Sequence, residues 1–141
     1  MKSIERCWIV ALLLMLVTVT GLLRAQSPVR GSIVEDRAAR KLLDAGDARF
    51  DANEKKKAVE VWQSVIERYP RSGVRFEAHM RLGDYLLKEE RAYDRARAHF
   101  EVVSGEDNRD DEQRAEALLN AGVCFYEARN FGKTFKVMRQ V

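Results

Sequence analysis

Hydrophobic residues recur at helical spacing through most of the chain beyond residue 31. The first such stripe includes Ala38 and Leu42, and charged residues fill the positions between. Ser32 precedes the stripe and Glu35 follows it by three residues, in the arrangement that caps the start of a helix. The pattern predicts a first helix over residues 33–53, with one face buried and the other solvated.

Five further stripes of the same period predict five further helices. The second helix should end just before Tyr69-Pro70, because proline cannot extend a helix and disfavours helical geometry in the residue before it. The predicted ranges are about 54–68, 72–87, 93–103, 112–129 and 131–141. The polar run of residues 105–111 is predicted to be a loop in which Asp110 or Asp111 caps the next helix. Every predicted element is a helix, so the fold class is all-α.

The chain repeats itself at an offset of 38 residues. Three positions recur in three copies: Ala58, Ala96 and Thr134; Trp62, Phe100 and Met138; and Val65, Val103 and Val141. A glycine precedes each set, at Gly46, Gly83 and Gly122. Self-similarity of this period is typical of stacked helix pairs. We predict a repeat domain over residues 32–141, with helix pairs at about 32–70, 72–104 and 110–141, the last of them incomplete.

The pattern Leu42, Gly46, Ala58, Trp62 and Pro70 resembles the tetratricopeptide repeat. The resemblance implies a helix-turn-helix repeat solenoid in which small residues lie where paired helices cross and a large residue fills the space before the next pair. It assigns a repeat-packing role to Gly46, Ala58, Trp62, Pro70, Gly83, Ala96, Phe100 and Gly122. The third copy departs from the pattern, because Thr134 and Met138 stand at the alanine and aromatic positions.

The same resemblance implies that the first helix of every pair lines a concave groove where a partner binds. The family's groove positions correspond here to five residues of each copy: Arg40, Leu43, Asp47, Phe50 and Asp51; Glu77, Met80, Asp84, Leu87 and Lys88; and Glu116, Leu119, Val123, Tyr126 and Glu127. Among them we select Asp47, Phe50, Met80, Asp84, Leu87, Leu119 and Tyr126 as the partner-binding residues. The apolar members would form a track flanked mainly by carboxylates. We therefore expect a partner segment with apolar anchors and basic flanks.

An apolar segment precedes the repeats. Residues 7–23 are 17 consecutive uncharged residues behind Lys2 and Arg6. The core of a signal peptide spans about 7–15 residues and a membrane-spanning helix needs about 20, so this length fits both an export signal and an anchor. Uncleaved, the segment would anchor the chain in the inner membrane.

The residues after the apolar run favour cleavage. Ala25 is a small residue suited to the position before the scissile bond, and a polar stretch follows it. We predict a signal peptide over residues 1–25 and a linker over residues 26–31. Two alternatives stay open: an uncleaved anchor, which the charge of Arg24 favours, and a cut after Gly21.

A narrower resemblance bears on location. The run Arg68-Tyr69-Pro70-Arg71-Ser72, with Leu82-Gly83-Asp84-Tyr85 after it, is similar to exported repeat proteins of bacterial envelopes, among them outer-membrane-assembly lipoproteins and the periplasmic partner of the Tol-Pal system. The resemblance implies an exported protein of the periplasm or cell envelope. This chain departs from the lipoproteins, because Cys7 precedes most of the apolar run, so no lipid anchor is expected.

The charges argue against nucleic acid as a partner. Beyond residue 25 the chain carries 22 basic and 21 acidic residues with the two signs interleaved. Nucleic-acid binding needs a concentrated basic face, which this distribution does not predict. Membrane contact is expected only through the N-terminal segment, if it is uncleaved.

Residues able to carry catalysis or hold a metal are few. His79 and His99 fall on different predicted helices, and no cysteine or carboxylate stands at a metal-like spacing from both. Cys124 has apolar neighbours on both sides and is predicted to be a buried small hydrophobe. No phosphate-binding glycine loop and no serine-centred elbow is found. We expect no metal, no cofactor and no enzymatic activity.

Together these observations predict a non-catalytic scaffold or adaptor that binds another exported or membrane protein. One alternative is a membrane-anchored structural subunit that self-associates through its last repeat, which has no polar capping helix. Another is the leading portion of a longer protein with an activity elsewhere.

Overall fold

The computed structural model describes residues 31–141, which form six helices. They are α2 (Ile33–Asp51), α3 (Lys55–Arg68), α4 (Val74–Lys88), α5 (Tyr93–Val103), α6 (Asp111–Glu127) and α7 (Phe131–Met138). Residues 31–141 contain no strand. The all-α prediction is therefore confirmed for this range, whereas the predicted signal or anchor over residues 1–25 and nearly all of the linker lie outside it.

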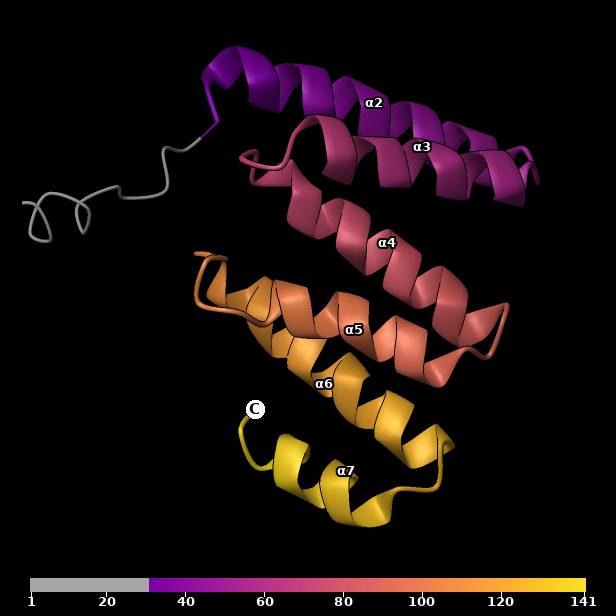
Figure 1. Cartoon of the computed structure of the whole chain (residues 1–141), viewed down its shortest axis with the longest axis vertical. Coiled ribbons are helices and arrows are strands. Elements are labelled where there is room, and N and C mark those ends of the chain that lie inside the picture. Colours follow the sequence, from indigo (N-terminus) through magenta and orange to yellow (C-terminus); the bar gives the residue numbers. More distant parts are fainter. Residues whose placement is uncertain (1–30) are drawn as a thin grey trace, which may run out of the picture.

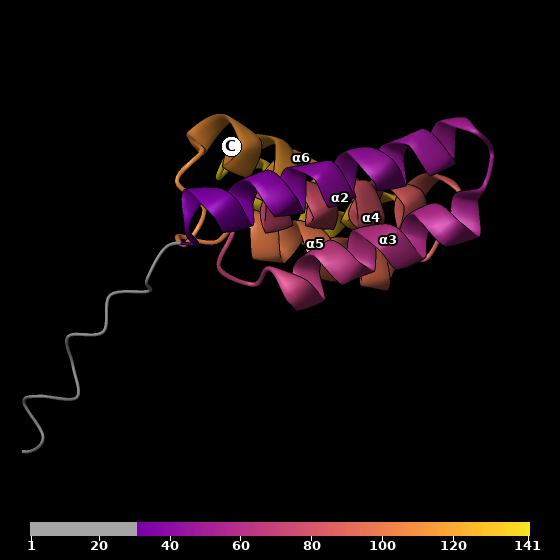
Figure 2. The same cartoon turned by 90° about the horizontal axis from the view of Figure 1, so that it is seen from above.

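The helices stack in chain order along the long axis, from α2 at one end to α7 at the other (Figure 1). Every helix packs against the helices before and after it in the chain, and α2 also touches α4. Seen from above, α3 and α5 lie on one side of the stack, and α2 and α6 lie on the other (Figure 2). This is the arrangement of a helical repeat solenoid, in which each pair is stabilised by its neighbours.

Side chains predicted to cap two of the helices do so. The Ser32 hydroxyl accepts a hydrogen bond from the Glu35 amide at 3.2 Å, and the Glu35 carboxylate accepts one from the Ser32 amide at 2.8 Å. The Asp110 carboxylate accepts from the Gln113 amide at 3.0 Å and so caps α6. Each bond satisfies an amide that has no partner within its helix.

The last helix is shorter than predicted. It ends at Met138, whereas the apolar pattern predicted a helix to Val141. No residue of α7 is buried, so the helix gains little from packing within residues 31–141. Helices of this length depend on tertiary contacts for their stability.

The turn inside every helix pair has the same backbone geometry. Asn53, Arg91 and Arg129 adopt positive φ angles of 61°, 52° and 57°. They are spaced by 38 residues, the offset of the sequence repeat. Asparagine tolerates this left-handed conformation better than arginine, so the first turn is built from the more suitable residue.

A glycine in the first helix of every pair faces a large side chain in the second. A Cβ atom added to Gly46 would lie 2.6 Å from the Trp62 indole, and one added to Gly83 would lie 2.7 Å from the Phe100 ring. At Gly122 the nearest atom would be the Met138 methyl, at 2.8 Å. The absence of a side chain at these positions lets the paired helices approach closely.

Two hydrophobic clusters form the core, and each is completed by the first helix of the following pair. The first contains Leu43, Trp62 and Val65 together with Val74, Ala78 and Leu82 of α4. The second contains Met80, Phe100 and Val103 together with Ala117, Ala121 and Cys124 of α6. The core of this protein is therefore made between pairs as well as within them.

Asn108 is a buried polar residue that the sequence did not single out. Its side-chain amide donates to the Val103 carbonyl at 3.1 Å and to the Gln113 side chain at 2.9 Å, and its own oxygen accepts from the Asp110 amide. These bonds fix the loop before α6, because a buried amide without partners would be strongly destabilising.

Within residues 31–141, no helix combines the length and the apolar character needed to cross a membrane.

Candidate functional site

A cleft opens between the C-terminal halves of α2 and α4. Its volume is about 410 Å³. It is lined by Asp47, Phe50, Asp51, Trp62, Arg81, Asp84, Tyr85, Lys88 and Glu89. The lining combines three aromatic side chains with six charged ones, so the cleft offers an apolar wall with a polar margin.

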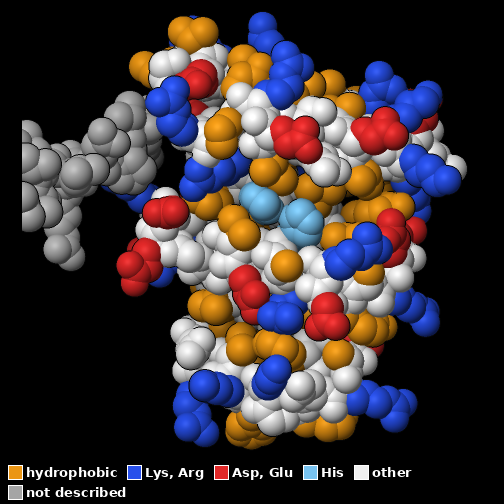
Figure 3. Space-filling view, viewed as in Figure 1, with side chains coloured by type: hydrophobic (Ala, Val, Ile, Leu, Met, Phe, Trp, Pro, Cys, Tyr) orange, Lys and Arg blue, Asp and Glu red, His pale blue; other side chains and the backbone are white. Residues whose placement is uncertain are grey.

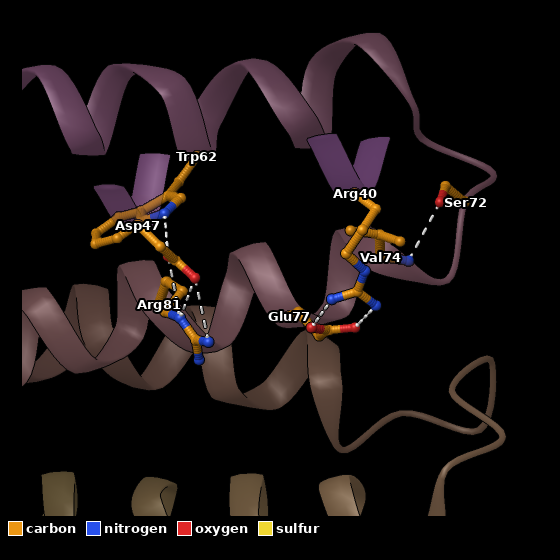
Figure 4. Close-up of polar contacts among 7 residues, drawn as sticks. All are labelled: Arg40, Asp47, Trp62, Ser72, Val74, Glu77 and Arg81. Carbon is orange, nitrogen blue, oxygen red and sulfur yellow. Dashed lines mark hydrogen bonds and ion pairs between the residues drawn. The ribbon is translucent and has the colours of Figure 1, made fainter. Parts of the chain in front are cut away.

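Asp47 joins three helices beneath the cleft. Its Oδ1 accepts a hydrogen bond from Trp62 Nε1 at 2.9 Å, and Arg81 Nε lies 3.3 Å from the same oxygen (Figure 4). Asp47 lies on α2, Trp62 on α3 and Arg81 on α4. Trp62 is almost completely buried, so without Asp47 its indole N–H would have no partner there. Asp47 therefore holds the walls of the cleft in position.

A second ion pair joins α2 to α4 one to two turns away. The Arg40 guanidinium donates two hydrogen bonds to the two oxygens of Glu77 (Figure 4). Bidentate geometry is among the stronger forms of this contact, and it raises the pKa of Arg40 through the bond to Glu77. Exposed pairs contribute little stability individually, and these two pairs link α2 to α4 at two levels.

The start of α4 is also tied to α2. The Ser72 hydroxyl donates to Asp36 Oδ1 at 2.6 Å and accepts from the Val74 amide at 3.2 Å, the latter bond being drawn in Figure 4. Ser72 is buried, so this polar contact is shielded from water. The two helices that form the cleft are therefore linked along their whole length.

The charge of the cleft is negative overall. Its lining carries four carboxylates against Arg81 and Lys88. Lys88 pairs with Asp84 at 2.8 Å, and Glu89 pairs with Lys55 of α3 at 2.6 Å. Asp51 is exposed and has no ion pair among the described residues. It is the carboxylate best placed to meet a cation from outside.

Aromatic residues form the apolar wall of the cleft. The Phe50 and Trp62 rings lie 5.4 Å apart at a tilt of 37°. The Lys55 ammonium lies 5.7 Å from the centre of the Phe50 ring. Phe50 is half-buried, so part of its ring stays open to a ligand.

The structure brings together some of the predicted groove residues and separates others. Asp47, Phe50 and Asp84 line the cleft. Leu87 is half-buried against the second core cluster and does not line it. Leu119 and Tyr126 lie on α6 and are exposed there. The predicted track is therefore not one continuous surface.

Met80 does not line a groove. It is 7% exposed and packs in the second core cluster beside Phe100. The second core cluster, which contains residues of α4, α5 and α6, encloses Met80. Helical spacing cannot distinguish a position inside such a cluster from one that faces a groove.

The sequence-based prediction omitted Arg81, Tyr85 and Glu89. The sequence contained a signal for Arg81, because this residue precedes the predicted residue Asp84 by three positions and so lies on the same face of α4. Tyr85 could not have been chosen in this way, since it follows Asp84 directly. Its position in the cleft depends on how α4 is rotated against α2.

The two histidines are paired with each other. His79 Nδ1 on α4 lies 2.9 Å from His99 Nδ1 on α5, and the two rings are side by side on one face of the molecule (Figure 3). Burial, then the neighbouring His99 and Arg75, lower the pKa of His79 to about 4, and burial with Arg95 lowers the pKa of His99. Both rings are therefore neutral near pH 7, and one donates a hydrogen bond to the other.

Cys124 is buried in the second core cluster, as predicted. Burial raises the pKa of its thiol to about 11, so the nucleophilic thiolate is scarce at neutral pH. Within residues 31–141, no three histidine, cysteine or acidic side chains gather as a metal site would require.

Comparison with known proteins identifies one part of the chain. Residues 42–72 match the family model of the tetratricopeptide repeat. This range covers the end of α2, all of α3 and the turn into α4. No curated protein and no solved structure matches the chain. The match supports the predicted repeat family, whose members generally bind other proteins.

Proposed function

We propose that this protein is a non-catalytic scaffold whose cleft between α2 and α4 binds a segment of a partner protein. The segment would insert an apolar side chain against Phe50 and place basic side chains beside Asp51. The cleft itself is the observation that carries the proposal, because it joins an aromatic wall to a negative margin on a preformed framework.

The framework supports binding without rearrangement. Asp47 and Arg40 hold α2 and α4 through ion pairs at two levels, and the buried Trp62 supports the cleft from below. A preformed site loses less conformational entropy on binding than a flexible one. The residues that line the cleft can therefore contribute their contacts directly to affinity.

A non-catalytic function agrees with how the reactive side chains are used. His79 and His99 bond to each other, and Cys124 is enclosed in the core. None of the three lines the cleft. These side chains serve packing in the described part of the chain.

We propose that this scaffold lies in the bacterial envelope. Residues 1–25 would direct its export as a cleaved signal, or residues 7–23 would anchor it in the membrane. The support is the apolar segment behind two basic residues and the resemblance to exported repeat proteins. The partner would then be another exported or membrane protein.

The test uses two synthetic peptides that differ only in charge. Both carry leucine and phenylalanine anchors, flanked in one by arginines and in the other by glutamates. Fluorescence anisotropy with the purified full chain should show tighter binding of the arginine peptide. Asp51→Lys should weaken that binding by about tenfold, which corresponds to about 1.4 kcal/mol.

Asp94→Lys is the matched control. It makes the same charge change as Asp51→Lys, at an exposed position on α5 away from the cleft. It should leave the affinity for the arginine peptide unchanged within about twofold. Equal binding of the two peptides, or equal losses in the two variants, would show that the cleft is not the site.

A further inference from the structure

Three equivalent positions are buried in the first two repeats and exposed in the third. Leu43 and Met80 are at most 7% exposed, whereas Leu119 is 45% exposed. Trp62 and Phe100 are at most 2% exposed, but Met138 is 38% exposed. Val65 and Val103 are fully buried, and Val141 is exposed.

The third repeat is exposed at these positions because no helix follows α7 among the described residues. In the first repeat these positions lie in a cluster completed by residues of α4, and in the second they lie in a cluster completed by residues of α6. Nothing in residues 31–141 covers α7 in the same way. The third repeat thus presents the same kind of stacking surface as the other two, but uncovered.

We call this region the α6–α7 surface. It comprises Leu119, Tyr126, Phe131, Phe135 and Met138. A hollow of about 580 Å³ lies within it, lined by Tyr126, Phe131, Thr134, Phe135, Met138 and Arg139. Tyr126 and Phe131 meet edge to face with ring centres 5.6 Å apart. Hydrophobic side chains reach the surface at this end of the stack in Figure 3.

The chain itself shows what shape of ligand fits such a surface. The helix that covers the first repeat contributes Val74, Ala78 and Leu82, and the helix that covers the second contributes Ala117, Ala121 and Cys124. Both sets are mostly small apolar residues spaced by three or four. The ligand shape indicated is therefore a helix with a narrow stripe of small apolar side chains.

The charge of the α6–α7 surface indicates which kind of helix would bind there. Residues 128–141 contain Arg129, Lys133, Lys136 and Arg139 and no acidic residue. The α7 side of the hollow is therefore basic, and Arg139 is the charged residue that lines the hollow. A helix that brings acidic residues beside its apolar stripe, where it meets α7, would be complementary.

Three other segments of this chain lack that charge. A second copy of the α6–α7 surface would bring the same basic residues. The outer face of α2 carries Arg37 and Lys41 at the positions that correspond to Val74 and Ala78. Residues 1–30 hold four basic residues against Glu5 alone. None of these is complementary to the basic margin.

We propose that the α6–α7 surface binds one acidic amphipathic helix of a partner protein, which stacks on α7 as α6 stacks on α5. This site lies at the opposite end of the stack from α2 and shares no residue with the cleft. Failure of either proposal therefore leaves the other intact.

The probe is a synthetic peptide of residues 110–128 of this chain with Cys124→Ala, which removes the thiol. It keeps Ala117 and Ala121 in its stripe and is acidic overall. Binding to the purified full chain is measured by fluorescence anisotropy. Binding should be saturable, and it should weaken as salt is raised.

Phe135→Ser in the full chain should weaken binding at least fivefold. Phe135 is 75% exposed, so its replacement should leave the fold intact, as circular dichroism would check. The matched control is Ile33→Ser, which removes a side chain that is 73% exposed at the other end of the stack. This control should bind the peptide as the unmodified chain does.

Five results would overturn the proposal. They are no binding of the peptide, equal binding of it by Phe135→Ser and Ile33→Ser, and equally tight binding of a peptide whose acidic residues are changed to lysine. The fourth is a dimer in sedimentation that Phe135→Ser dissociates, which would make a second copy the occupant. The fifth is tighter binding of anionic lipid vesicles through Phe135 than of the peptide, which would make a membrane the occupant.

Discussion

At the scale of single residues, the three glycines show that one repeat position is packed more tightly in some repeats than in others. Gly46 and Gly83 face the rigid rings of Trp62 and Phe100, which are buried. Gly122 faces the flexible end of Met138, which is partly exposed. The same residue type is therefore constrained tightly in two copies and loosely in the third.

This difference predicts a ranking for replacement by alanine. Gly46→Ala should lower the free energy of unfolding by about 1–3 kcal/mol, because the indole cannot move aside without disturbing the core. Gly122→Ala should be nearly neutral, since Met138 can shift and alanine favours the helix by about 0.5–1 kcal/mol over glycine. Urea unfolding followed by circular dichroism measures both values. Equal losses in the two variants would contradict the packing described here.

Met80 shows where prediction at the residue scale stops. Its apolar character and its place on the apolar face of a helix are those of Phe50, yet Met80 lies in the second core cluster and Phe50 lines the cleft. Periodicity identifies the buried face of a helix, but the neighbour that buries each position depends on how the helices cross. Asp47 is a similar case, because it was predicted as a partner contact and its bonds to Trp62 and Arg81 also make it a support of the fold.

At the scale of helices, starts and stops that depend on local chemistry were predicted well. Ser32 and Glu35 cap α2, and α3 ends before Pro70. The predicted end of α7 was wrong, because where this helix ends depends on packing that the sequence pattern does not reveal. The pairing of His79 with His99 could not be predicted either, since it depends on the rotation of α4 against α5.

The histidine pair predicts how stability changes with pH. Both histidines have a lowered pKa in the fold, so the fold favours their neutral forms. Their contribution is complete above the unfolded pKa of about 6.5 and is lost as pH falls towards the folded pKa of His79, about 4. Allowing for partial solvent exposure, the loss should be about 1 kcal/mol.

The measurement compares the chain with a double variant, His79→Leu with His99→Leu, by urea unfolding at several pH values between 7 and about 4. Carboxylates titrate in both proteins, so the difference between them isolates the histidines. The double variant should lose less stability than the unmodified chain as pH falls. Parallel loss in the two proteins would show that the pair does not govern this dependence.

At the scale of the whole molecule, the solenoid separates two kinds of surface. The cleft lies between first helices of adjacent repeats and has a negative margin, whereas the α6–α7 surface lies at the end of the stack and has a basic margin. The repeat family and the offset of 38 residues were accessible from the sequence, because small and large residues must recur in register for pairs to stack. The division into two surfaces was not, since it depends on which repeat positions are covered.

The proposed role of the whole molecule depends on the cleft between α2 and α4 receiving a partner segment. Its most direct test is a titration of the isotope-labelled full chain with the arginine-flanked peptide, followed through the backbone amide shifts in NMR spectra. We expect saturable shifts that are largest at Phe50, Asp51, Tyr85 and Lys88. Shifts confined to α6 and α7, or no saturable shift at all, would contradict it.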